Sequence, residues 1–117
     1  MLPVSVFLSE ASFYHNRPTE IVDILCGQLA QFGSIVLYDD SYVLNFEVGK
    51  AKLKAIENMI MIRVESGDLI SSYAIKTLIE GHLVEVDDIK ETAILWIPVK
   101  VEPFASLADC TSLMKKK

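Results

Sequence analysis

The chain has 117 residues and a formal net charge of -5 at neutral pH. This length is enough for one domain with a hydrophobic core that needs no disulfide or metal ion. We expect that domain at residues 1–100, followed by a tail at residues 101–117. Nucleic acid and membrane are excluded as expected partners, because both repel an acidic protein at long range.

The composition also bears on oligomeric state and compartment. Hydrophobic residues make up 51% of the chain, which is high for a small monomer and favours an oligomer interface. Cys26 and Cys110 lie far apart without ligand spacing, so we expect reduced thiols in a cytoplasmic protein. Ser9 and Glu10 interrupt the first apolar stretch, which predicts no secretory signal, and no apolar run is long enough to cross a bilayer.

The first third of the chain predicts a strand followed by a helix. Alternating apolar residues predict the strand from Val4 to Ser9. Pro18 suits the first turn of a helix, and Gly33 suits the position after its last turn. Between them, apolar residues recur at helical spacing over about four turns. These residues are Ile21, Leu25, Leu29 and Phe32.

The centre of the chain carries the strongest pattern, an alternation of apolar and polar residues from Val43 to Val64. It follows a short apolar strand at Ser34–Tyr38 and a turn at Asp39-Asp40-Ser41. This pattern predicts an antiparallel meander with one face on a core. We expect Gly49, where the meander reverses, to need a backbone angle that other residues resist. The residues expected to face the helices are Leu44, Phe46, Ile60 and Ile62.

A second helix and a final strand are predicted after the meander. Ser66 or Asp68 caps the helix, and Asp87-Asp88 closes it. The apolar pattern from Thr92 to Ile97 predicts a last strand, in which the side chain of Trp96 points to the core. Because proline cannot donate to a ladder, that strand ends at Pro98 or lies at a sheet edge. The inward stripe of the second helix is expected to be Ile75, Leu78, Ile79, His82 and Val86.

The element order determines the predicted architecture. It reads β-α-β-β-β-(β)-α-β, without the alternating βαβ units of a parallel sheet. We therefore predict an α+β two-layer sandwich, in which an antiparallel sheet of about five strands carries both helices on one face. From Glu102 onward the periodicity is lost, although Phe104, Leu107 and Ala108 fit one short amphipathic helix.

Short motifs are spread over most of the chain: Leu25-Cys26, Asp39-Asp40, Phe46…Gly49…Leu53-x-Ala55, Ile60-x-Ile62-x-Val64, Glu80-Gly81-His82-Leu83 and Trp96. In their order and spacing, from Val4 to Pro98, the chain resembles the bacterial domain-of-unknown-function family 2218. The resemblance implies a cytoplasmic domain that stands alone, or that in relatives is appended to siderophore-interacting flavin reductases. It brings no established activity. Gly27 and Gln28 stand where that family tends to have a basic residue and a His, which weakens any role for a His in the first helix.

His82 is the residue that a functional interpretation selects first, because it matches the family's His-Leu pair. A packed, hydrogen-bonded role is nevertheless favoured, since neither His15 nor Cys26 shares ligand spacing with it. A small-ligand or metal-binding pocket near His82 is the alternative. We predict no catalytic residue, metal site or cofactor, because no Gly-rich loop precedes a helix and no Gly-x-Ser-x-Gly elbow occurs. Arg17 and Arg63 are expected to be solvated.

The face of the predicted sheet that points away from the helices is the stronger functional lead. An apolar sheet face is a liability in water, and a homodimer that packs sheet to sheet is favoured over a ligand cleft. We therefore expect a non-enzymatic domain that acts through this face, as a homodimer or as an accessory module for a protein partner. The resemblance adds a link to iron-siderophore handling. The apolar members of the face are Val43, Met59, Met61, Tyr38, Val36 and Leu95.

Overall fold

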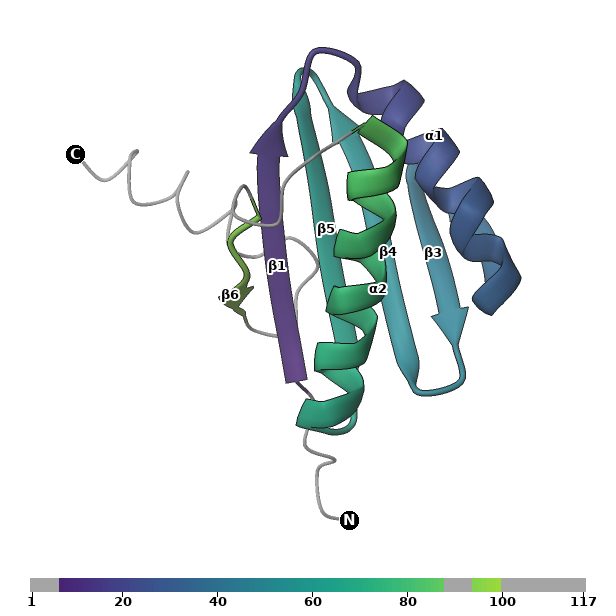
Figure 1. Cartoon of the computed structure of the whole chain (residues 1–117), viewed down its shortest axis with the longest axis vertical. Helices are drawn as coiled ribbons and strands as arrows, with labels where there is room; N and C mark the ends of the chain where they lie inside the picture. The colour runs from purple at the N-terminus through teal and green to yellow at the C-terminus, as the bar shows by residue number, and fades with distance from the viewer. Residues whose placement is uncertain (1–6, 88–93, 100–117) are drawn as a thin grey trace, which may run out of the picture.

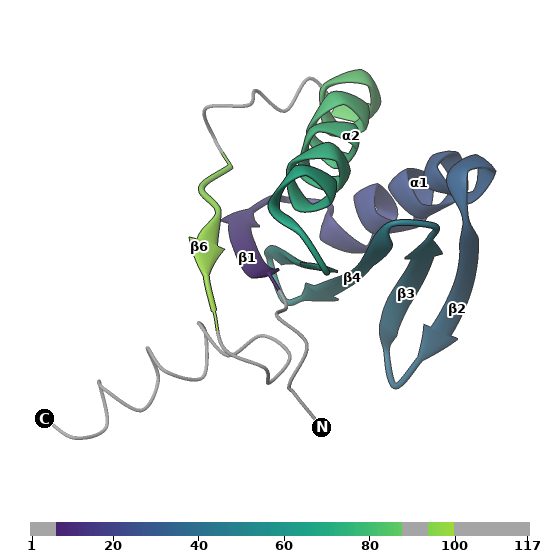
Figure 2. The ribbon, with the colours of Figure 1, turned by 90° about the horizontal axis from the view of Figure 1, so that it is seen from below.

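One antiparallel sheet and two helices make up the two layers of the computed structural model, which describes residues 7–87 and 94–99 (Figure 1). The elements are β1 (Phe7–Tyr14), α1 (Pro18–Leu29), the 3-10 helix η1 (Ala30–Phe32), β2 (Ser34–Tyr38), β3 (Ser41–Phe46), β4 (Gly49–Ile56), β5 (Met59–Ser66), α2 (Leu69–Asp87) and β6 (Ile97–Pro98). The strand order is β2-β3-β4-β5-β1-β6. Both helices lie on one face (Figure 2), so the predicted α+β two-layer sandwich is confirmed.

The hydrophobic core lies between the helices and the inner face of the sheet. Leu25 and Leu29 of α1 and Ile79 and Leu83 of α2 point into it and are fully buried. Burying one such side chain contributes about 1.5–3 kcal/mol relative to leaving it in water. The period of two in the meander supplies the opposing surface, as predicted. The buried residues of the meander that face the helices are Leu44, Ala51, Leu53, Ile60, Ile62 and Val64.

The helix starts follow the sequence signals closely. Pro18 occupies the first turn of α1, and Asp68 precedes α2, where its Oδ1 accepts the Ser71 backbone N–H at 2.7 Å. The hydrogen bonds from Ser71 hold the pKa of Asp68 below its usual value. The buried stripe of α2 includes Leu83, which the prediction left out, whereas His82 is only partly buried. Within residues 7–87 and 94–99, no helix has the length and apolar character needed to cross a bilayer.

The turns of the meander place acidic residues, rather than glycines, in left-handed backbone conformations. Asp39 and Asp40 have φ angles of 52° and 67°, and Glu57 has 52°. No glycine in the described part of the chain has a positive φ, so the reason predicted for Gly49 is wrong. A Cβ atom on Gly49 would collide with the carbonyl oxygen of Glu65. Glycine is needed there because two strands approach closely.

The first strand runs further than the alternation predicts. β1 continues from Phe7 through Ser9 and Glu10 to Tyr14, whereas the prediction ended the strand at Ser9. Glu10 is tolerated inside the strand because its carboxylate pairs with a buried arginine on β5. Val4, where the predicted strand begins, lies outside the described residues.

The last strand is shorter than predicted. Only Ile97 of the predicted strand Thr92–Ile97 belongs to β6, and residues 92–93 lie outside the described part of the chain. β6 pairs with β1 at a sheet edge, which agrees with the edge placement predicted for Pro98. Trp96 packs half-buried against the core, and its indole N–H donates to Glu80 Oε2 at 2.6 Å. The tail at 101–117, with Cys110 and the terminal lysines, is also outside the described residues.

Candidate functional site

The face of the sheet opposite the helices carries the predicted interface residues, but also basic ones. The strand register places Tyr38 on β2, Val43 on β3, and Met59 and Met61 on β5 on this helix-free face. The central strand β4 adds three lysines between the residues of β3 and those of β5, so the apolar surface is not continuous. These lysines are Lys50, Lys52 and Lys54.

The helix-free face has two halves that differ in exposure. The buried half is the part of β1 and β5 that contains Leu8, Glu10, Met61 and Arg63. At the other end of β1, Ser12 and Tyr14 are exposed. The open half, on β2 and β3, consists of Val36, Tyr38 and Val43. Met61 is 3% exposed, whereas Val36 and Tyr38 are 52% and 71% exposed. Of the predicted interface residues, Tyr38 and the half-buried Val43 thus lie in the open half, and Met61 lies in the buried half.

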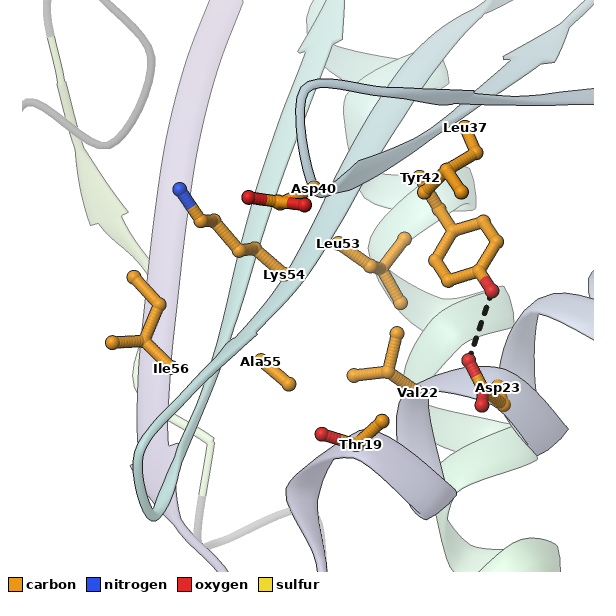
Figure 3. A pocket seen from close by; sticks show the side chains of 10 residues that line it. All are labelled: Thr19, Val22, Asp23, Leu37, Asp40, Tyr42, Leu53, Lys54, Ala55 and Ile56. Carbon is orange, nitrogen blue, oxygen red and sulfur yellow. Dashed lines mark hydrogen bonds between the residues drawn. The ribbon is translucent and has the colours of Figure 1, made fainter.

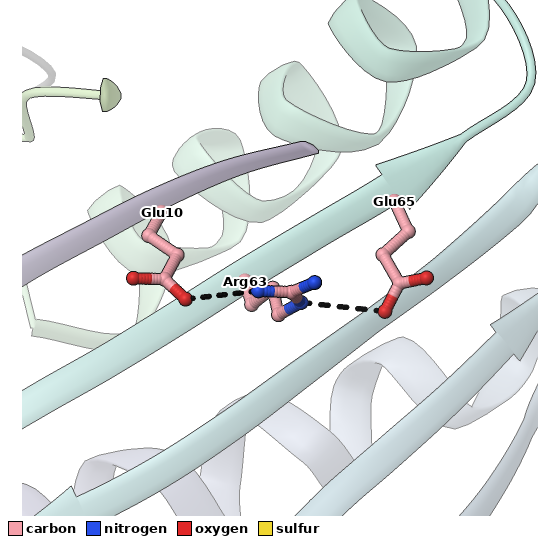
Figure 4. Close-up of polar contacts among 3 residues, drawn as sticks. All are labelled: Glu10, Arg63 and Glu65. Carbon is pink, nitrogen blue, oxygen red and sulfur yellow. Dashed lines mark hydrogen bonds and ion pairs between the residues drawn. The ribbon is translucent and has the colours of Figure 1, made fainter. Parts of the chain in front are cut away.

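A buried ion network lies at the centre of the buried half (Figure 4). Arg63 lies on β5. Its Nη1 is 3.1 Å from Glu10 Oε2 on β1, and its Nε is 3.3 Å from Glu65 Oε2, which is also on β5. The arginine is 1% exposed, so the expectation that it is solvated is wrong. A guanidinium cannot leave water without compensating carboxylates. The signal in the sequence is a charge at position 63 in line with Met59 and Met61, between the apolar residues Ile62 and Val64.

His82 has structural contacts on α2. Its Nδ1 lies 3.0 Å from the Leu78 carbonyl oxygen, so Nδ1–H is the donor, and its ring meets Phe32 edge to face with centroids 5.7 Å apart. Among the described residues, no group of three or more His, Cys, Asp or Glu side chains is arranged to hold a metal ion. A small hollow of about 220 Å³ lies between α2 and η1, and His82 is not among its lining residues. The pocket predicted near His82 stays an untested alternative.

A wider, open hollow of about 620 Å³ lies on the helix side of the sheet, between α1 and the β2–β3 hairpin (Figure 3). Its floor is apolar, with Val22, Leu53 and Ala55, and Leu37 of β2 lines it from the side of the hairpin. Tyr42 Oη donates a hydrogen bond to Asp23 Oδ1 at 2.9 Å across it. This bond and the charge of Asp23 raise the pKa of Tyr42 above its ordinary value. The contact ties β3 to α1, and the sequence interpretation missed it.

Cys26 behaves as a packed residue. It lies buried in α1. Burial and the charge of the nearby Asp23 raise the pKa of its thiol to about 12. A thiol with so high a pKa carries almost no thiolate at neutral pH, and the thiolate is the nucleophilic form. In this environment Cys26 packs as a small hydrophobic residue.

Comparisons with known proteins identify a fold and no family. No family model and no curated protein matches the chain. Among solved structures, the chain is similar to the NMR structure of PA4090 from Pseudomonas aeruginosa, with a TM-score of 0.66 and 18% sequence identity. The match covers 81% of this chain and 99% of that chain. At this identity the likeness supports the fold alone, and membership of family 2218 stays a prediction.

Proposed function

We propose that this protein is a non-catalytic, cytoplasmic interaction domain that acts through the open half of its helix-free sheet face. It works as a homodimer or as an accessory module for a protein partner. One observation carries the proposal: Val36 and Tyr38 are more than half exposed on a strand that carries no charge. Exposed apolar side chains that gather on one strand are typical of surfaces that another protein covers.

Three side chains that could serve in catalysis have structural roles instead. Arg63 lies between Glu10 and Glu65, and His82 bonds to a carbonyl oxygen of its own helix. The thiol of Cys26 is buried and protonated. These contacts favour a binding role over a reaction, because nucleophiles and bases must reach a substrate.

The border of the open half constrains the partner. Val43 lies directly opposite Lys52 in the sheet, and Lys50 and Lys54 flank that lysine on the same face. A partner that covers Val43 therefore needs an apolar centre and acidic groups on the side facing β4. If the resemblance to family 2218 holds, that partner belongs to iron-siderophore handling.

Native mass spectrometry and sedimentation velocity of wild type and two tyrosine variants test this proposal. Tyr38→Lys should weaken association, because it places a charge in the open half. Tyr14→Lys is the matched control, since Tyr14 is also an exposed tyrosine on the helix-free face but lies on β1, away from the open half. Association that is equally strong in both variants would contradict the proposal. A bound small mass in the native spectrum would instead support the ligand-binding alternative.

A further inference from the structure

The two edges of the sheet are protected to different degrees. β6 closes one edge with two residues, and its Pro98 has no N–H to offer. The other edge is β2, five residues without charge or proline. Figure 2 shows β2 as the outermost strand at the end of the sheet away from β6. Within residues 7–87 and 94–99, β2 pairs with β3 alone.

The register of the β2–β3 hairpin determines which backbone groups point to the free edge. Asp39 and Asp40 form a two-residue turn with both φ angles positive, and Tyr38 faces Ser41 across it. A turn of this kind closes on a hydrogen-bonded pair, and such pairs alternate along an antiparallel ladder. Val36 and Ser34 therefore bond to β3. The N–H and C=O groups of Ile35 and Leu37 point away from β3.

We propose that β2 pairs antiparallel with β2 of a second copy of this chain, about a two-fold axis at Val36. This rests on the proposed function, because it names the partner of the open half. Ile35 of one protomer then lies opposite Leu37 of its partner, and the outward groups of these residues form four backbone hydrogen bonds. Two six-stranded sheets become one continuous sheet, and the exposed edge of each disappears.

In this register the side chains of β2 in one protomer pack against those of β2 in its partner. Val36 meets Val36 on the helix-free face, at a non-hydrogen-bonded position where side chains are closest. Ile35 meets Leu37 on the helix side, and Leu37 is 63% exposed without a partner. No two like charges face each other, since the strand has none.

The acidic turn also fits a second copy. Asp39 of one protomer lies opposite Gly33 of its partner, which has no side chain to clash and no charge to repel. The two Asp39 residues are six positions apart along the paired strands, or roughly 20 Å at the strand rise. That exceeds the screening length of about 8 Å at physiological salt. A hairpin with a net negative tip can therefore pair with its own copy.

Charge variants at the two-fold axis test the register. Val36→Lys and Val36→Glu each place two like charges face to face and should weaken dimerisation by about tenfold or more. An equimolar mixture of the two variants should recover a dimer, because unlike charges then meet at the axis. Sedimentation velocity at micromolar concentration measures all three samples, with circular dichroism to confirm that each variant is folded.

Leu37→Pro tests the backbone pairing separately. It removes an N–H that β3 does not use, so the protomer should fold while the dimer loses two of its four hydrogen bonds. Leu37→Ala is the matched control, since it also removes the side chain but keeps the N–H. We expect Leu37→Pro to be at least about tenfold weaker as a dimer than Leu37→Ala.

Three results would overturn the pairing. The first is a wild-type chain that is monomeric at high micromolar concentration. The second is a mixture of Val36→Lys and Val36→Glu that stays monomeric. The third is a folded Leu37→Pro protein that dimerises as tightly as Leu37→Ala. If Leu37→Pro still dimerises and Tyr38→Lys added to it dissociates the dimer, the interaction uses the sheet face and not the strand edge. The proposed function then survives without the pairing.

Discussion

The two halves of the helix-free face have the same strand geometry and opposite environments. In the buried half, an arginine and a glutamate are almost completely removed from water beside Met61. In the open half, Val36 and Tyr38 stand in water on an uncharged edge strand. The buried half therefore contains charged side chains and the open half contains exposed apolar ones, which is the reverse of the usual distribution. The contrast separates residues that hold the fold from residues available to a partner.

The largest expected effect comes from removing a charge in the buried half. Glu10→Ala takes away a carboxylate that compensates the charge of Arg63, whose side chain is only 1% exposed. We expect a loss of about 3–5 kcal/mol in the free energy of unfolding, because the guanidinium stays buried with less compensation. Urea denaturation followed by circular dichroism measures it.

An exposed ion pair provides the control for that loss. Arg17 and Glu20 are 2.9 Å apart, and their side chains are 50% and 54% exposed. Glu20→Ala should therefore change stability by less than about 1 kcal/mol. Equal losses in Glu10→Ala and Glu20→Ala would show that burial does not set the strength of the Arg63 network.

A pair of alanine substitutions compares the two halves directly. Met61→Ala should cost about 2–4 kcal/mol, because a buried side chain leaves a cavity. Tyr38→Ala should change stability by less than about 0.5 kcal/mol, since the ring is mostly in water. Thermal unfolding of the two variants side by side gives both values. A Tyr38→Ala protein that is as unstable as Met61→Ala would mean that the open half is part of the fold.

The sequence predicts the sheet well because alternation is a local signal. Leu44, Ile60 and Ile62 reach the core as expected, since a period of two leaves only one face for them. The same alternation predicts which residues share the other face. It does not predict whether that face is covered, which is why Met61 and Tyr38 looked equivalent in sequence.

The features that the sequence interpretation missed are long-range. Arg63 and Glu10 are far apart in the chain, and only the pairing of β1 with β5 brings them together. Gly49 was recognised for the wrong reason, because the close approach of Glu65 depends on the packing of two strands and not on the local turn. The position of β2 at an edge likewise follows from the strand order alone.

The next-largest expected loss of stability concerns Gly49, at the start of β4, the strand that separates the two halves. Gly49→Ala places a Cβ against the carbonyl oxygen of Glu65 and should cost about 1–3 kcal/mol through displaced strands. Gly81→Ala is the matched control, because its Cβ would meet nothing within 4 Å inside α2. That change should stabilise the protein by about 0.5–1 kcal/mol through helix propensity. Chemical denaturation of both variants should therefore give shifts of opposite sign, and shifts of the same sign would contradict the close approach.

The smallest expected effect concerns the contact that joins β3 to α1. The hydrogen bond from Tyr42 to Asp23, together with the charge of Asp23, raises the pKa of Tyr42 above its ordinary value of 10.0. Because the folded-state pKa is higher than the unfolded one, the contact stabilises the fold fully below the unfolded value. That stabilisation is lost as the pH rises through the folded-state pKa. Wild type should therefore be slightly more stable than Tyr42→Phe at neutral pH, and this difference should vanish at strongly alkaline pH.

Phenolate absorbance isolates the titration of Tyr42 as the difference between the curves of wild type and Tyr42→Phe. Asp23→Asn should bring that titration down toward the ordinary value, because the amide carries no charge and accepts a weaker hydrogen bond. An unchanged titration in Asp23→Asn would mean that the raised pKa does not come from Asp23. The sheet would then be held to α1 by the core packing that includes Leu53 and Val22 rather than by this contact.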